Sequence, residues 1–287
     1  MRWLAAFLAS LAVIAVAWVG WPSVAATAHV ATEAARRAGT LASLRDWPRM
    51  QTPEFTVYYP VGAGTQADIV AAVADTYYPQ VAADFGIAHS GRHVIVVLSA
   101  AQMLQLAGPG TSAPPLGIYN YGVVWLLEPS AFLPSGAGLE ASYAAQGPVP
   151  HELTHLADDL ASAGRIPRWL DEGIAQYEEW RLNGYVWRQS DNSFSLPTYT
   201  WNQLSADFVN LPNQAMAYRQ ALAAATLICG EGQGTCVHVL HLLAQGTSVN
   251  AALDAVIGPR PLGRLEAGAA WPAGWRPAWT RQTAPAP

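Results

Sequence analysis

The chain contains no lysine, only two cysteines and few charged residues of any kind. Charged residues make up 12% of its 287 residues and apolar residues 52%, whereas ordinary globular domains are roughly 25% charged. So apolar a chain is not intrinsically disordered as a whole, and its length allows one large domain or two lobes. Its 15 basic residues are all arginine, form no cluster and leave a net charge of −5. We therefore expect no nucleic-acid partner.

The two cysteines are too few for a fold built on disulfides, and they lack the spacing of a zinc ribbon. Cys229 and Cys236 are separated by a glycine-rich stretch of six residues. In an oxidising compartment they are expected to form a short-loop disulfide, and the alternative is a pair of buried thiols.

The N-terminus is a long uncharged stretch. No charged residue occurs from residue 3 to residue 32, and residues 3–19 form one apolar run. This pattern predicts that residues 1–28 are either a cleaved signal peptide, with Ala26 and Ala28 offering the cleavage site, or a single membrane anchor. In both cases the rest of the protein is expected to be extracytoplasmic, either secreted or anchored to the cell membrane.

The remaining sequence divides into a linker over residues 29–50, which is a short helix or a spacer, a folded domain over residues 51–268, and a proline-rich tail over residues 269–287. Hydrophobic periodicity predicts strands first and helices later. The expected strands are 55–59, 93–99 and 122–129. The expected helices are 66–85, 149–162, 168–182 and two or three between 213 and 269. The expected loops are 108–121, 134–147 and 183–212, the last with a possible hairpin.

The sequence HELTH, residues 151–155, lies within a predicted helix. His151 and His155 are four residues apart, about 40° around the helix, so both rings can reach one metal ion. Neutral imidazoles suit zinc, and Glu152 can act as general base toward a water on the metal. Taken alone, the motif also fits a solvated helix face.

A third ligand is available on the next predicted helix. Glu172, in the sequence WLDEG, follows His155 after sixteen residues and a turn that contains Gly164 and Pro167. An antiparallel hairpin brings its carboxylate to the two histidines. The acids also gather here, because seven of the chain's 20 lie between His151 and Glu179.

HELTH together with WLDEG and the following AQYEE resembles the gluzincin metallopeptidases, most closely their compact peptidase MA-like domains, over about residues 51–268. The resemblance implies that His151, His155 and Glu172 bind one zinc ion and that Glu152 is base and proton shuttle. It also implies that Tyr218, in AMAYRQALAAATLI, donates a hydrogen bond to the developing oxyanion. The alternative for this tyrosine is simple packing on a helix face.

The sequence also departs from the large zinc aminopeptidases that share WLDEG. The interval before the metal glutamate is two residues shorter, and their Gly-x-Met-Glu-Asn element is missing. In its place stands the predicted strand around residues 121–128, which is either a sheet edge that pairs with the substrate backbone or an ordinary core strand.

The other acids and histidines have less defined roles. Glu179 shares a helix face with Glu172 and is either a hydrogen-bond partner of a metal-bound histidine or a solvent-facing acid. Asp171 is expected to be a first-turn helix acid. The acids expected to face solvent are Glu178, Asp158 and Asp159.

His238 and His241 are expected to pack on a helix rather than to bind a second metal, since no carboxylate accompanies them. The histidines with no partner in the sequence are His29, His89 and His93.

Together these features predict an α+β, zincin-like fold: a small mixed β-sheet with helices before the metal helix, and a helical C-terminal lobe. The expected function is an exported zinc endopeptidase that acts on peptides or proteins. The alternative is a degenerate zincin that serves as an envelope binding or sensory module, and a purely structural zinc is the weaker third hypothesis. The sequence leaves the oligomeric state open.

Overall fold

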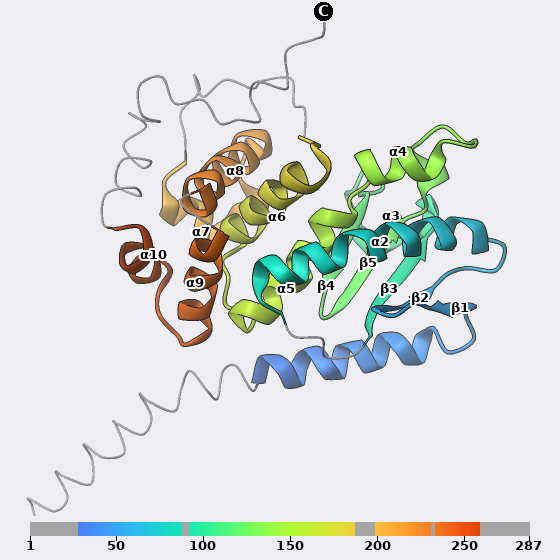
Figure 1. Ribbon diagram of the computed structural model, residues 1–287, viewed down its shortest axis with the longest axis horizontal. Helices are drawn as coiled ribbons and strands as arrows, with labels where there is room; N and C mark the ends of the chain where they lie inside the picture. Colours follow the sequence, from blue (N-terminus) through green and yellow to red (C-terminus); the bar gives the residue numbers. More distant parts are fainter. Residues whose placement is uncertain (1–27, 88–91, 187–198, 231–232, 259–287) are drawn as a thin grey trace, which may run out of the picture.

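The computed structural model describes residues 28–87, 92–186, 199–230 and 233–258, which form an α+β fold around one five-stranded sheet (Figure 1). The expected signal or anchor, except for its last residue 28, the end of the expected domain over residues 259–268 and the proline-rich tail lie outside the described residues. Within the described part of the chain, no helix combines the length and the apolar character needed to cross a membrane.

The sheet is mixed, with spatial order β1-β2-β3-β5-β4. The strands are β1 (Arg49–Gln51), β2 (Phe55–Tyr58), β3 (His93–Leu98), β4 (Gly117–Asn120) and β5 (Val123–Leu127). Strands β2, β3 and β5 run parallel, whereas β1 and β4 lie antiparallel at the two edges. The three predicted strands are confirmed as β2, β3 and β5.

Strand β4 corrects two expectations. The stretch 108–121 is not only loop, because it contains β4. Of the two alternatives for residues 121–128, the sheet edge is wrong and the core strand is confirmed, because β5 pairs with both β3 and β4. The glycine and proline residues of this stretch have low strand propensity, so the sequence pattern does not indicate the strand. Pairing with β5 outweighs this low propensity. The stretch 134–147 likewise contains a short helix, α4 (Leu139–Gln146), where a loop was expected.

Helices make up most of the remaining structure (Figure 1). Besides α4 they are α2 (Gly64–Phe85), α3 (Ala100–Ala107), α5 (Val149–Ser162), α6 (Arg168–Asn183), α7 (Trp201–Asp207), α8 (Gln214–Gly230), α9 (Gln233–Ala244) and α10 (Val249–Ile257), with 3-10 turns η1 (Pro129–Ala131) and η2 (Phe208–Asn210). Residues 28–43 are also helical, which decides between the helix and the spacer expected there.

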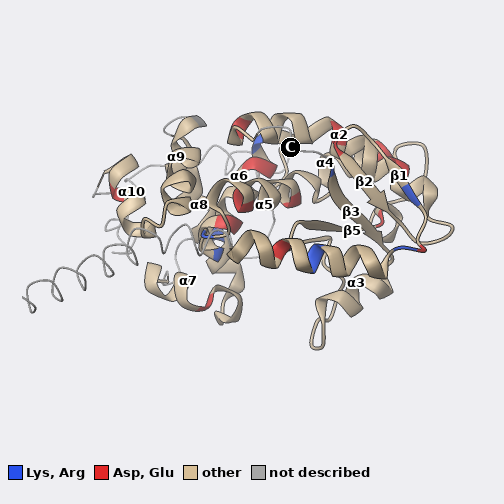
Figure 2. Cartoon of the chain, turned by 90° about the horizontal axis from the view of Figure 1, so that it is seen from below, with Lys and Arg blue, Asp and Glu red and all other residues tan. Residues whose placement is uncertain are grey.

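Helices pack on both faces of the sheet, so the side chains that point alternately to its two sides are buried in two cores. Ile95 and Val97 belong to the larger core, which includes residues of α2, α5 and α6. Val94 and Val96 belong to a smaller core on the other face, where Leu44 follows the helix of residues 28–43. Figure 2 shows that helix and α3 on the side of the sheet opposite to α2.

The α5–α6 hairpin is confirmed, and its turn follows from the local sequence. Helix α5 ends at Ala163 and Gly164, whose φ values of 52° and 69° lie in the left-handed region. Pro167, in extended conformation, then precedes the first residue of α6. Proline fits this N-cap position because its fixed φ matches the extended backbone there, and its missing N–H removes no hydrogen bond within the helix.

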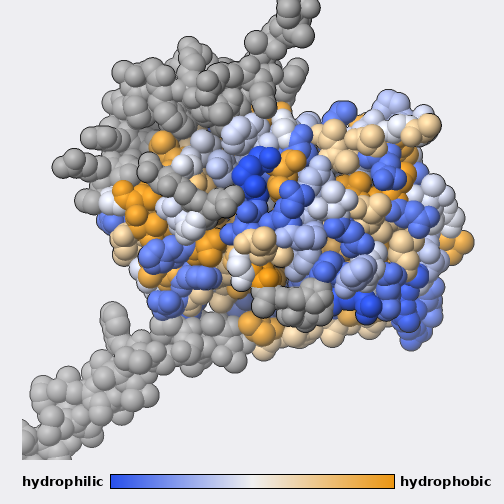
Figure 3. Space-filling model, viewed as in Figure 1, coloured by the Kyte–Doolittle hydropathy of each residue, from blue (hydrophilic) through white to orange (hydrophobic). Residues whose placement is uncertain are grey.

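The C-terminal part is helical, as expected, and begins with α7, which lies in the stretch 183–212 where loop was predicted. No strand occurs among the described residues of that stretch, and residues 187–198 lie outside the description. Cys229 and Cys236 form a disulfide that joins the end of α8 to α9, so the bridge is confirmed. Figure 3 shows hydrophilic and hydrophobic residues interspersed on the face that carries α2 and α6.

Candidate metal centre

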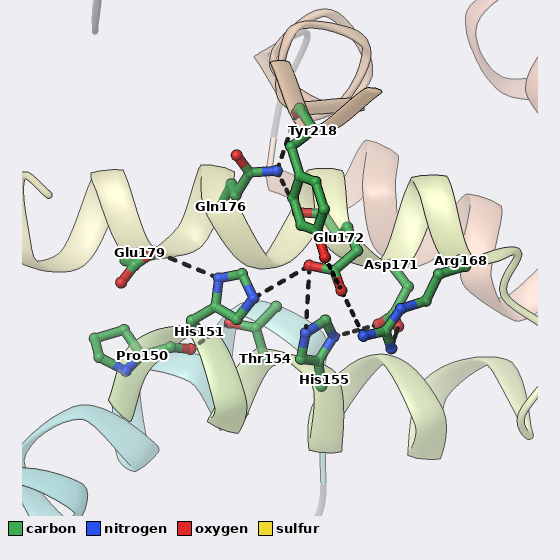
Figure 4. A network of polar contacts seen from close by, with 10 residues as sticks. All are labelled: Pro150, His151, Thr154, His155, Arg168, Asp171, Glu172, Gln176, Glu179 and Tyr218. Atoms are coloured by element: carbon green, nitrogen blue, oxygen red, sulfur yellow. Dashed lines mark hydrogen bonds and ion pairs between the residues drawn. The ribbon is translucent and has the colours of Figure 1, made fainter. Parts of the chain in front are cut away.

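His151 and His155 lie on α5 with their Nε2 atoms directed at one oxygen of Glu172 on α6 (Figure 4). Glu172 Oε2 is 3.3 Å from His151 Nε2 and 3.8 Å from His155 Nε2. The side chains of His155 and Glu172 are each only 3% exposed, and that of His151 is 16% exposed. The three groups that the sequence suggested as ligands are thus together in one largely buried site.

The opposite ring nitrogens are also held by carboxylates. His155 Nδ1 donates a hydrogen bond of 2.6 Å to Asp171, and His151 Nδ1 lies 3.4 Å from Glu179. This arrangement fixes each ring so that Nε2 faces Glu172, which is how outer carboxylates orient metal-binding histidines. Glu179 is buried rather than solvent-facing. Asp171 stands in the first turn of α6 as expected, but its contact with His155 escaped the sequence analysis.

The donor set fits a zinc ion. One ligand atom from each of His151, His155 and Glu172 lies within 4.8 Å of the others. Glu172 Oε2 is buried, and the partners nearest to it are the two imidazole nitrogens, as expected for a carboxylate oxygen that would share a cation with them. Two imidazoles and one carboxylate are also a donor set that leaves a position open for water on zinc.

The charges of the site favour a bound cation as well. Burial alone would raise the pKa of Glu172, but its hydrogen bond with His151 and the nearby charges of His155 and Arg168 lower this pKa to about 2. Burial would lower the pKa of His151, whereas Glu172 and Glu179 raise it well above its usual range. In the absence of metal, a proton on His151 therefore balances a carboxylate that stays ionised.

Glu152 is buried beside the edge strand β4. A Cβ atom built on Gly117 would lie 2.5 Å from Glu152 Cγ, so glycine is what allows this side chain to lie against the strand. Burial raises the pKa of Glu152, although His155 and His151 partly offset it. Its Oε2 has no hydrogen-bond partner among the described residues, and a raised pKa suits a group that accepts and returns a proton.

Tyr218, on α8, reaches the same centre and donates a hydrogen bond of 3.3 Å to Glu172 Oε1. Its ring also packs against Phe208, with ring centroids 5.0 Å apart, so it has packing contacts as well as a polar one. Burial, followed by the negative charge of Glu172, raises the pKa of Tyr218. The phenol therefore keeps its proton and remains a hydrogen-bond donor.

Close packing of α6 on α8 brings Tyr218 to Glu172. A Cβ atom on Gly173 would overlap the backbone oxygen of Ala221, so the glycine of WLDEG lets the two helices approach. Gln176 Nε2 joins the same helices by donating to the backbone oxygens of Glu172, at 3.0 Å, and Tyr218, at 3.1 Å. Gln176 carries no signal in the sequence, because its partner on α8 is distant in the chain.

Arg168 is a further member of the site that the sequence analysis missed. Its guanidinium lies 2.5 Å from Glu172 Oε1 and 3.1 Å from Asp171 Oδ2. Arg168 precedes Asp171 by three residues and Glu172 by four on one helix, and this spacing in the sequence is the signal that could have indicated the ion pairs. The arginine side chain is 47% exposed, so it lies at the border between the buried centre and solvent.

The three acids expected to face solvent are buried or partly buried instead. Asp158 is fully buried, Glu178 is 6% exposed, and the Asp159 side chain is 13% exposed. Glu178 pairs with Arg181, which also contacts Asp84. These acids face neighbouring elements because α5 and α6 are covered on several sides, and Figure 2 shows acidic residues gathered on the two helices.

The remaining histidines divide into three groups. His93 lies 2.6 Å from the Tyr78 hydroxyl, and His29 lies close to Glu33 and Asp159, so both have partners that the sequence did not show. His238 and His241 are exposed on α9 and belong to no metal-binding cluster among the described residues. His89 lies outside the described residues.

Comparisons with known proteins add no family assignment: no family model matches the chain, and no curated protein matches it.

Proposed function

We propose that the protein is a zinc-dependent metallopeptidase of the gluzincin type, exported and either secreted or anchored by its N-terminal segment. The observation that carries this proposal is the orientation of two imidazoles. His151 and His155 direct Nε2 at Glu172 Oε2, while Glu179 and Asp171 face their other ring nitrogens. A structural zinc commonly has four protein ligands, whereas this centre offers three and a neighbouring buried glutamate.

Each group has a defined role in the proposed reaction. His151, His155 and Glu172 would hold zinc, which supplies Lewis-acid polarisation of a carbonyl and lowers the pKa of a water. Glu152 accepts a proton from the attacking water and passes it to the leaving amine. Tyr218 donates a hydrogen bond to the carbonyl oxygen as negative charge develops on it.

The sheet edge supports a peptide as substrate. Strand β4 is an edge strand, so one side of its backbone is not paired within the sheet, and Glu152 lies against its Gly117. An extended peptide added to this edge would place a peptide bond near the proposed base, and its affinity would come from main-chain hydrogen bonds. The same edge position and the mixed sheet support a zincin-like arrangement of the fold.

The test combines zinc analysis with cleavage of casein by the full-length protein. The proposal expects chelator-sensitive cleavage, and Glu152→Gln should lose it while zinc remains bound. Glu140→Gln, a change at an exposed residue of α4, is the matched control and should cleave at the parent rate. Cleavage by Glu152→Gln at the parent rate would refute the role of the base. Zinc binding with no cleavage of any unstructured protein would favour the binding or sensory module.

A further inference from the structure

A second cluster of metal-binding side chains lies outside the proposed peptidase centre, between the helix of residues 28–43 and the end of α5. We propose that His29, Glu33 and Asp159 bind a divalent transition-metal ion that fastens this N-terminal helix to α5. The inference does not depend on the proposed peptidase function.

The three donors converge as ligands do. His29 Nε2 is 2.9 Å from Asp159 Oδ1 and 3.8 Å from Glu33 Oε2, and one donor atom of each residue lies within 4.8 Å of the others. Ligands about 2.1 Å from a tetrahedral zinc ion lie about 3.4 Å from one another. His29 and Glu33 are four residues apart on one helix face, and Asp159 comes from an element far away in the sequence.

The carboxylates of Glu33 and Asp159 lie close together and are largely shielded from solvent. The Glu33 and Asp159 side chains are only 16% and 13% exposed, and the His29 side chain is 28% exposed. Burial, and next the negative charge of Asp159, raise the pKa of Glu33. His29 and Arg37 offset this rise in part, and Arg37 also donates a hydrogen bond to the backbone oxygen of Arg92. A bound cation would offset the repulsion between the two acids.

The surroundings leave room for these side chains. Cβ atoms built on Gly122 and Gly164 would overlap the Glu33 carboxylate and the His29 ring, respectively. Gly122 lies in the β4–β5 turn and Gly164 in the α5–α6 turn, both with positive φ. The two turns thus form a cradle into which the donors of the N-terminal helix fit.

Asp159 is oriented for a ligand role. The Tyr119 hydroxyl donates a hydrogen bond of 2.6 Å to Asp159 Oδ2 and accepts one of 3.2 Å from the backbone N–H of Gly122. This contact occupies one carboxylate oxygen and leaves Oδ1 facing His29. Hydrogen bonds of this kind position metal-binding carboxylates in proteins.

The donor chemistry selects the class of ion. One imidazole nitrogen and two carboxylate oxygens suit zinc and similar first-row ions, whereas calcium prefers a shell made only of oxygen. Asp159 lies four residues beyond His155, so α5 would carry ligands of both metal sites. The second ion would therefore connect the N-terminal helix to the element that holds the proposed peptidase centre.

Zinc titration of the full-length protein against a chromogenic chelator tests this site. We expect two zinc equivalents in the parent, one in His29→Ala and one in His155→Ala, which removes a ligand of the other centre. His29→Ala and His155→Ala combined should bind none. His238→Ala, a change at an exposed histidine of α9, is the matched control and should keep both equivalents.

The outcomes separate the two metal sites. Loss of one equivalent in His29→Ala supports the second site even if the protein cleaves no peptide. If His29→Ala keeps the stoichiometry and the affinity of the parent, His29 and Asp159 form only an ion pair and the inference is wrong. Glu33→Gln provides a second test that keeps the side chain's size, and it should weaken the same equivalent at least 10-fold.

Discussion

His155 donates from Nδ1 to Asp171 across the α5–α6 hairpin, while its Nε2 faces the neighbouring Glu172 (Figure 4). The two nitrogen–oxygen distances are 2.6 and 3.8 Å. Two adjacent acids of α6 therefore lie on opposite sides of one imidazole: one orients the ring, and the other shares the proposed metal with it. This relationship makes the role of Asp171 separable from that of Glu172.

Asp171→Asn should weaken zinc binding by about 10- to 100-fold. A neutral amide accepts a weaker hydrogen bond from His155 Nδ1 than a carboxylate does, so it orients the ring less firmly and raises the basicity of Nε2 less. Chelator competition measures the affinity. Asp68→Asn, at an exposed position of α2, is the control and should bind zinc as the parent does. Parent-like affinity in Asp171→Asn would mean that this carboxylate does not orient the ligand.

Gly117→Ala should lower peptide cleavage with little loss of zinc. The new methyl group would occupy space now filled by Glu152, and the displaced carboxylate could no longer exchange its proton in position. Steady-state cleavage and zinc content are measured on the same sample. Gly138→Ala introduces a methyl group with no heavy atom within 4 Å and should leave both unchanged. Full activity in Gly117→Ala would contradict the proposed position of the base.

Tyr218→Phe should reduce turnover by roughly 100- to 1000-fold while zinc stays bound, since the hydroxyl is the proposed donor to the developing oxyanion. The change should lie mainly in kcat rather than KM. Tyr59→Phe, at a half-buried tyrosine beyond the end of β2, is the matched control. Unchanged kinetics in Tyr218→Phe would remove its hydroxyl from the mechanism and leave its packing on Phe208 as its role.

Asp158→Asn should stabilise the metal-free protein increasingly as pH rises. Asp158 is fully buried, and neither carboxylate oxygen has a hydrogen-bond partner among the described residues. Burial, and next the charge of Asp171, raise its pKa well above the usual range. The folded state thus retains a proton that the unfolded chain releases, so stability falls as pH rises above about 4.

Urea unfolding at about pH 4 and about pH 7 measures this difference, because the asparagine variant lacks the titration. Asp254→Asn, at an exposed position of α10, should show no such divergence from the parent. If parent and Asp158→Asn lose stability in parallel over this range, Asp158 does not carry the pH dependence.

Much of the site was predictable because its signals are local. Helical spacing places His151 and His155 on one face, and a glycine and proline turn returns the chain so that Glu172 approaches them. The disulfide between Cys229 and Cys236 was likewise within reach of the sequence, as one of two alternatives. In each case the deciding residues lie within one helix or across one short turn.

The contacts that the sequence missed depend on distant segments. Gln176 bonds to the backbone of Tyr218, 42 residues away, and His29 approaches Asp159 only because the N-terminal helix docks beside α5. Strand β4 was missed because its glycine-containing sequence forms a strand only by pairing with β5. Such positions are set by tertiary packing, which a local pattern does not encode.

The most direct measurement is anomalous X-ray diffraction at the zinc edge from crystals of the protein grown with zinc. We expect a peak within bonding distance, about 2.0 to 2.2 Å, of His151 Nε2, His155 Nε2 and a Glu172 oxygen. Zinc in excess with no peak among these three side chains would contradict the proposed centre, whatever is found at His29.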